Sequence, residues 1–310
     1  QVANTAIANA QALDTDQDEN TSTPESCAEA TLNTQDCLRA LSVAEILLAQ
    51  GSVWSFPTTG TSTLPKSFAE QLTSGDFNKV PVMIGGNLDE GKLFVALNEF
   101  AGNDPITDMN TYANTAANPV YLATGGSLVP GVFAGYVQAA TAEYASHNYA
   151  GDAEDFFSLA LAGIWTDGFF ACHNKNMISE LSEHVNTYAY EFTDVLAPNV
   201  YTMAAIATGN NNLLASIPLG AAHSFELQYL FQPISRMQVM GGTEEQVALS
   251  ENMVDYFAQF AKTGNPNSLD NSLESWSTFA DSSAYQSLNT NMGTISSAEF
   301  SAAHNPSVSG

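Results

Sequence analysis

The segment Val80-Pro-Val-Met-Ile-Gly-Gly-Asn-Leu-Asp-Glu-Gly91 carries the strongest fold signal in this 310-residue chain. Its apolar residues form a short continuous run bounded by turn residues, which is typical of a strand buried on both faces of a parallel sheet. We expect the strand at 80–85, a turn at the two glycines and Asn87, and a helix that Asp89 and Glu90 open. The segment therefore predicts an α/β fold in which an acid follows the carboxyl end of a strand, where such sheets place their ligand sites.

Other segments fit the same α/β class. Residues 185–192 are aromatic and are a second strand candidate, and residues 285–289 are a further, short one. Residues from about 98 to 184 have a mainly helical pattern. The clearest helix is predicted at 250–263, where apolar residues form one stripe, with its first residue as the cap and Gly264 closing its end. A sheet of this type needs more parallel strands than these candidates provide, so we expect its N-terminal strands to lie outside this chain.

The charge balance excludes two classes of partner. The chain has 33 acidic and 7 basic residues, a formal net charge of −26, and 45% apolar residues. Such a field repels nucleic acid and anionic membrane surfaces, so we expect neither as a partner, while the apolar share indicates a globular chain. Since no run of 18 apolar residues occurs, we expect no transmembrane segment.

The three cysteines suggest different roles. Cys27 and Cys37 could clip a short loop in an oxidising compartment, or they could be two reduced thiols. Cys172 stands in an apolar helical context and is predicted to be a small buried hydrophobic residue.

No metal or other cofactor is expected. The spacing of Asp14, Asp16 and Asp18 resembles the start of a calcium loop, with Glu25 at its twelfth position. However, Glu19 stands where the sharp turn of such a loop needs a glycine.

Two residues are candidates for catalysis, and each also has a structural interpretation. Glu90 could be an acid that the helix dipole favours in a first turn, or the acid of a catalytic triad. His223 lies in Leu219-Gly-Ala-Ala-His-Ser-Phe-Glu-Leu-Gln-Tyr-Leu-Phe231, where small neighbours leave the imidazole room to reach a partner, although a lone histidine is often structural. In hydrolases built on open α/β sheets the triad follows the order serine, acid, histidine, and here the last two occur in that order.

The nucleophile is what the sequence lacks. A nucleophile elbow needs small residues around its serine, and no Gly-x-Ser-x-Gly occurs in the chain. The nearest approach, around Ser127, has Val129 in place of the second glycine and no apolar strand before it, so we interpret Ser127 as a loop residue.

With these residues in view, the chain resembles the C-terminal portion of the type-B carboxylesterase and lipase family, the cholinesterase-like branch of the α/β-hydrolases. The resemblance covers nearly the whole chain. It is carried, in the family's order, by Cys27 with Cys37-Leu-Arg-Ala-Leu, Phe77–Gly85 with Asp89-Glu-Gly91, Thr166–Cys172, Tyr188–Phe192, Gly220–Glu226, and Phe260–Asn267 followed by Trp276.

The resemblance implies the C-terminal part of an α/β-hydrolase catalytic domain over residues 1–310, incomplete without an N-terminal portion. It implies Glu90 and His223 as triad members, Leu93 and Phe94 as pocket residues or simply helix core, and a disulfide between Cys27 and Cys37. The expected reaction is hydrolysis of a small-molecule or lipid carboxylic ester through an acyl-enzyme, in a secreted or periplasmic location.

Under this interpretation the nucleophilic serine and the oxyanion hole come from the N-terminal portion or from a partner chain, and this chain alone is inactive. Two alternatives remain open at this point. One is a catalytically inactive adhesion or binding homologue of the same fold, and the other is a self-sufficient small domain with a different role.

Overall fold

The computed structural model describes residues 59–108, 130–145, 156–201, 217–231, 234–268 and 273–304, with a few isolated positions elsewhere. The chain divides into two compact units, Gln1–Ser67 and Phe68–Gly310, and all helices and strands described below belong to the second. Cys27, Cys37 and the acidic motif at 14–25 lie outside the described residues. The disulfide and the assignment of the whole chain to one catalytic domain therefore stay predictions.

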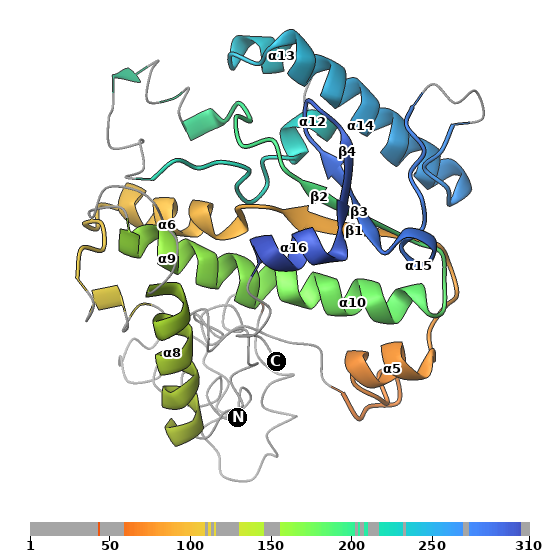
Figure 1. Ribbon diagram of the computed structural model, residues 1–310, viewed down its shortest axis with the longest axis horizontal. Helices are drawn as coiled ribbons and strands as arrows, with labels where there is room; N and C mark the ends of the chain where they lie inside the picture. The colour runs from red at the N-terminus through yellow and green to blue at the C-terminus, as the bar shows by residue number, and fades with distance from the viewer. Residues whose placement is uncertain are drawn as a thin grey trace, which may run out of the picture. The chain divides into compact units, whose positions relative to one another are not determined.

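The described part of the chain contains a mixed sheet of four strands in the order β1-β2-β3-β4 (Figure 1). The strands are β1 (Val82–Asn87), β2 (Thr187–Phe192), β3 (Ala284–Leu288) and β4 (Gly293–Ser296). The first three run parallel and β4 is antiparallel to β3. A parallel core with one antiparallel edge strand is a common α/β arrangement.

Strand β1 extends further than its sequence predicted. The expected turn at the two glycines and Asn87 is part of the strand, since Gly85 pairs with Tyr190 and Gly86 with Glu191. A Cβ atom at Gly85 would lie 2.2 Å from the Tyr190 carbonyl oxygen. The glycine pair thus permits close strand packing rather than a turn.

Helices make up most of the remaining described structure. One of them is η1, a π-helical turn that lies between α9 and α10. The helices are α5 (Phe68–Ser74), α6 (Glu90–Phe100), α8 (Pro130–Ala145), α9 (Phe156–Trp165), η1 (Thr166–Ala171), α10 (Cys172–Ser182), α12 (Leu227–Phe231), α13 (Ile234–Val239), α14 (Glu244–Thr263), α15 (Phe279–Ser282) and α16 (Ser297–Ala303).

Helices cover both faces of the sheet, as Figure 1 shows with α14 on one side and α10 on the other. On the α14 side, Phe192 and Leu288 pack with Tyr229 and Met253. The opposite face is covered by η1, α10 and α16, through a core cluster that comprises Ala171, Ile178, Ala189, Tyr285 and Phe300. Burial of both faces explains why the strand segments are rich in apolar and aromatic residues.

Helix α14 begins earlier than its apolar stripe predicted. Thr243 is the N-cap and forms a capping box with Gln246, whereas Ser250 is buried inside the helix and donates a 2.6 Å hydrogen bond to the Tyr229 carbonyl oxygen. The prediction of Ser250 as the cap was wrong because the stripe, which starts at Met253, lies well inside the helix and does not mark its beginning. Gly264 closes the helix with φ of 74°, as predicted.

Close contact between α6 and α9 sets the position of the site described below. A Cβ atom at Gly91 would lie 2.0 Å from the Ala162 carbonyl oxygen, so only glycine allows this approach. The Gly91 N–H donates to Thr166 Oγ1 at 2.9 Å, which joins α6 to the first residue of η1. The neighbouring Cys172 is buried, 3% exposed, as its apolar context predicted. Within the described ranges, no helix combines the length and apolar character needed to span a bilayer.

Candidate active site

Glu90 and His223 come together beyond the carboxyl end of β1. Glu90 is the first residue of α6 and is 6% exposed, and its Oε2 atom lies 2.6 Å from Nδ1 of His223. The His223 side chain is 39% exposed. A buried acid bound to one nitrogen of an accessible imidazole is an arrangement suited to a general base.

Asn87, the last residue of β1, braces both members of this pair. Its backbone N–H donates to the other oxygen of Glu90, Oε1, at 2.8 Å. Its side-chain Nδ2 donates to the carbonyl oxygen of Ala222 at 2.7 Å and to Oε2 of Glu226 at 2.5 Å. Asn87 therefore fixes the acid through its backbone N–H and ties the loop that carries the histidine to the strand through its side-chain amide.

A second link joins Asp89 to the same loop. The Asp89 N–H donates to the Ala221 carbonyl oxygen at 3.1 Å, and the Ala221 N–H donates to Asp89 Oδ2 at 3.0 Å. Lys92 Nζ lies 2.8 Å from the other oxygen of Asp89. At Gly220, where φ is 60°, a Cβ atom would lie 2.1 Å from Asp89 Oδ2, so the loop needs glycine there both for its conformation and for space.

The loop adopts a sterically costly backbone immediately after the histidine. Ser224 has φ of 68°, in the left-handed region, which costs a residue with a Cβ atom about 1–2 kcal/mol. Such a conformation persists only where its surroundings hold it. Here Ala221 and Ala222 are fully buried, and the two links to β1 and α6 hold the preceding backbone.

Aromatic rings flank the imidazole. The ring centroids of Phe94 and Phe170 each lie 5.2 Å from that of His223, and Trp165 stacks on Phe94 at 5.2 Å. A cavity of about 230 Å³ is lined by Phe94 and Trp165, together with Leu161, Ile106 and the more polar Glu99 and Asp104. The site therefore presents an apolar wall next to its one accessible imidazole.

The two predicted pocket residues differ in their surroundings. Phe94 lies against His223, whereas Leu93 is 6% exposed and packs in the core with Ala221 and Ala222. The helix-core interpretation thus describes the place of Leu93, and a contact of Phe94 with substrate stays a prediction.

The charges near the imidazole favour its protonated form. The hydrogen bond that His223 donates to Glu90 raises the pKa of His223, although burial acts in the opposite direction. Burial raises the pKa of Glu226, while its hydrogen bond from Asn87 opposes that rise. A negative carboxylate at hydrogen-bond distance stabilises the imidazolium that forms when a base takes a proton.

Sequence reasoning missed Asn87, Asp89 and Phe170 as parts of this site. Asn87 ends a parallel strand and Asp89 follows it, at the strand end where ligand-facing residues gather, and this position was a usable signal. Phe170 had none, because an aromatic residue in an apolar helical segment has the same pattern as a core residue.

Comparison with known proteins gives a consistent family. The chain is 27% identical to mouse (Mus musculus) acylcarnitine hydrolase over 242 residues, which cover 75% of the chain and 38% of that protein. It is 26% identical to human cocaine esterase over 260 residues, 82% of the chain and 41% of that protein. Acetylcholinesterase of Leptinotarsa decemlineata is 22% identical over 244 residues, 74% of the chain and 35% of that protein.

These matches place the chain against only part of each relative. It spans about two fifths of the length of the curated relatives named here. The four-stranded mixed sheet covered by helices is consistent with part of an α/β-hydrolase fold. The model of the carboxylesterase family matches residues 2–305, nearly the full length, and the chain therefore belongs to the carboxylesterase family.

Proposed function

We propose that this chain supplies the acid and the histidine of a Ser-His-Glu triad that hydrolyses carboxylic esters through an acyl-enzyme. The observation that carries the proposal is the 2.6 Å contact between Glu90 Oε2 and His223 Nδ1, which joins two residues 133 positions apart. The relatives named above include hydrolases and esterases, and the proposal brings the ester class, not their individual substrates, to this chain.

The geometry assigns a role to each nitrogen of the imidazole. Ionised Glu90 accepts a hydrogen bond from Nδ1–H, so neutral His223 has its lone pair on Nε2. When a serine Oγ attacks the ester carbonyl carbon, Nε2 takes the serine proton and Glu90 stabilises the imidazolium. The imidazolium then gives this proton to the departing alcohol, and water, activated by the same nitrogen, releases the acid from the acyl-enzyme.

The nucleophilic serine and the oxyanion donors, in this proposal, belong to an N-terminal portion of the same enzyme or to a partner chain. Two observations support this: the chain contains no Gly-x-Ser-x-Gly, and it spans about two fifths of the length of the relatives. The flanking rings of Phe94 and Phe170 favour an ester with an apolar acyl or alcohol group. A secreted location remains part of the proposal.

The test is to express the chain joined to the polypeptide encoded directly upstream of Gln1, and to express the chain by itself. The joined enzyme should hydrolyse a panel of short- and long-chain p-nitrophenyl esters and lose that activity to a serine-directed organophosphate. The isolated chain should do neither, since losing a triad member costs about 10⁴-fold or more in turnover. Hydrolysis by the isolated chain, or a joined enzyme that binds esters without cleaving them, would overturn the proposal; the latter result fits an inactive binding homologue.

A further inference from the structure

A second buried histidine lies outside the proposed triad. His304 follows α16 and is 2% exposed. Its Nδ1 lies 2.7 Å from Asp167 Oδ1, and its Nε2 lies 2.6 Å from Glu191 Oε1. The ring therefore bridges η1 and β2, segments 137 and 113 residues away in the sequence.

The bridge requires a charged ring. Ionised carboxylates only accept hydrogen bonds, so a ring that binds one carboxylate through each nitrogen must carry a proton on both. Burial disfavours that charge, but the hydrogen bonds and the attraction of Asp167 and Glu191 outweigh it and raise the pKa of His304 to about 9. The result is an imidazolium held between two buried carboxylates.

Further titratable groups face this cluster. Tyr144 of α8 donates a 2.5 Å hydrogen bond to Asp167 Oδ2. On β3, burial and the charge of Glu191 raise the pKa of Tyr285. The Asp89–Lys92 pair borders the same cavity, of about 200 Å³, as Asp167 and His304.

The cluster is joined to the catalytic pair through η1. Asp167 is the second residue of this π-helical turn, and π-turns in helices are frequent at functional sites. Thr166, just before it, accepts the hydrogen bond from the Gly91 N–H, next to Glu90. Phe170, at the other end of the turn, lies 5.2 Å from the His223 ring.

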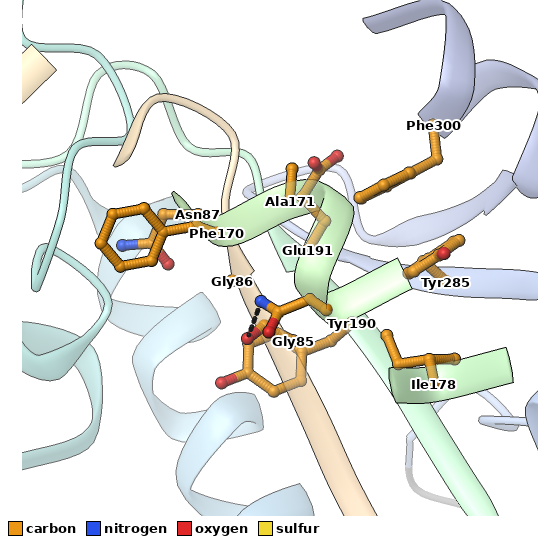
Figure 2. Close-up of a pocket in the computed structure, with 11 residues that line it drawn as sticks. Gly85, Gly86, Asn87, Phe170, Ala171, Ile178, Tyr190, Glu191, Tyr285 and Phe300 are labelled. Atoms are coloured by element: carbon orange, nitrogen blue, oxygen red, sulfur yellow. Dashed lines mark hydrogen bonds between the residues drawn. The ribbon is translucent and has the colours of Figure 1, made fainter. Parts of the chain in front are cut away.

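The packing between η1 and the sheet leaves little freedom. Figure 2 shows Phe170 and Ala171 close to Asn87 and Gly86 of β1, with Glu191 nearby. The cavity that these residues line has a volume of about 10 Å³, room for one water molecule at most. A shift of the Phe170–Ala171 end of the turn towards the sheet is therefore passed to its neighbours there rather than absorbed by empty space.

We propose that His304 is a positioning residue for the catalytic histidine. By holding Asp167 and Glu191 together, it fixes the π-helical turn that places Phe170 against His223 and Thr166 against the start of α6. The catalytic role of His223 itself rests on the proposed function, whereas the coupling between the two histidines does not.

The coupling can be measured on the 310-residue chain without any activity. With ¹⁵N-labelled histidine, the ring signals of His304 and His223 are followed by NMR from pH 5 to 10. We expect His304 to titrate at about pH 9, and the His223 signals to show a second inflection at the same midpoint. A His304 that titrates near its ordinary value, or a His223 without that inflection, would overturn the proposal.

Variants separate positioning from general stabilisation. Asp167→Asn keeps the shape of the side chain but removes its charge, so the midpoint of His304 should fall and the second inflection of His223 should move with it. His304→Gln should abolish the second inflection, whereas His173→Gln, an exposed histidine on α10, should leave both titrations unchanged. If His304→Gln fails to fold, the titration of the unaltered chain still decides whether the two histidines are coupled.

In the complete enzyme, His304→Gln should lower kcat/KM roughly 10- to 100-fold, mainly through kcat, and shift the pH profile. Loss of stability alone would lower the active fraction without moving the profile. An enzyme that cleaves no ester while the NMR coupling persists would defeat the proposed function and leave the positioning role intact. Full activity with an unchanged pH profile in His304→Gln would defeat the positioning role and leave the proposed function intact.

Discussion

Asn87 Nδ2 lies 2.7 Å from the carbonyl oxygen of Ala222, a contact that spans 135 positions of sequence and ends one residue before His223. The same asparagine donates its backbone N–H to Glu90. The acid and the histidine are therefore oriented by one residue that would itself take no part in proton transfer.

Asn87→Ala should loosen the histidine loop. Removal of the amide leaves the Ala222 carbonyl and the partly buried Glu226 carboxylate without this donor, at a cost of about 1–3 kcal/mol in the free energy of unfolding. The matched control is Asn267→Ala, because Asn267 braces the backbone of Trp276 in a similar way far from the site. Urea denaturation should show a similar loss for both variants, and only Asn87→Ala should change the His223 NMR signals. Equal NMR effects would contradict this role for Asn87.

Glu90→Gln should lower the pKa of His223. The hydrogen bond that His223 donates to the Glu90 carboxylate is the largest cause of the raised pKa, so a neutral amide at position 90 removes most of that effect. In the joined enzyme kcat/KM should fall at acidic pH, because the base must be deprotonated to act. The midpoint of this acidic limb should lie above pH 6.5 in the unaltered protein and should move to lower pH in the variant. Turnover should fall by about 10⁴-fold.

Glu226→Gln is the control for this comparison, since Glu226 contributes less to the pKa of His223 than Glu90 does. Its acidic limb should move less than that of Glu90→Gln. The assignment of Glu90 as the acid fails if the two variants behave alike.

Gly91→Ala should be strongly destabilising, because its Cβ atom would lie 2.0 Å from the Ala162 backbone oxygen and would force α6 away from α9. Gly135→Ala is the matched control in α8, where an added Cβ atom meets nothing within 4 Å. There the change should stabilise the chain by up to about 1 kcal/mol through helix propensity. Thermal unfolding followed by circular dichroism measures both. A stable Gly91→Ala chain would mean that the helices have room to separate.

Stability should fall as pH rises from about 6.5 to 9. The pKa of His304 in the folded chain is about 9, above its ordinary value of 6.5. Below pH 6.5 the ring carries its second proton in both the folded and the unfolded state, and the stabilisation is fully present. Between pH 6.5 and 9 only the folded state keeps this proton, so the stability of the fold decreases as the pH rises. The rise in the pKa of His304 on folding corresponds to about 3 kcal/mol in the free energy of unfolding.

The measurement for this prediction is urea denaturation at pH 6 and at pH 9.5 for the unaltered chain and for His304→Gln. The difference between the two chains should shrink as pH rises, because His304 has lost its charge at the higher pH. A difference that is constant with pH would show that Asp167 and Glu191 do not hold a charged ring.

The local sequence was a good guide where neighbouring residues decide the outcome. The apolar run before Gly85, the aromatic segment ending at Phe192 and the glycine after α14 all predicted elements close to those observed. The predictions failed at element boundaries, where longer-range contacts compete. Gly85 and Gly86 remain in β1 because they pair with Tyr190 and Glu191 of β2. Helix α14 begins six residues before Ser250 because Thr243 and Gln246 form a capping box.

The sequence by itself identified Glu90 and His223 as candidates, since strand-end position, small neighbours and chain order are local or linear properties. Only the tertiary structure decided that Nδ1 of His223 meets Oε2 of Glu90, that Asn87 braces both, and that His304 binds Asp167 and Glu191. The physical reason is that a buried polar side chain must find a partner, and nothing in the linear pattern specifies which of many distant polar groups the fold will bring within about 3 Å.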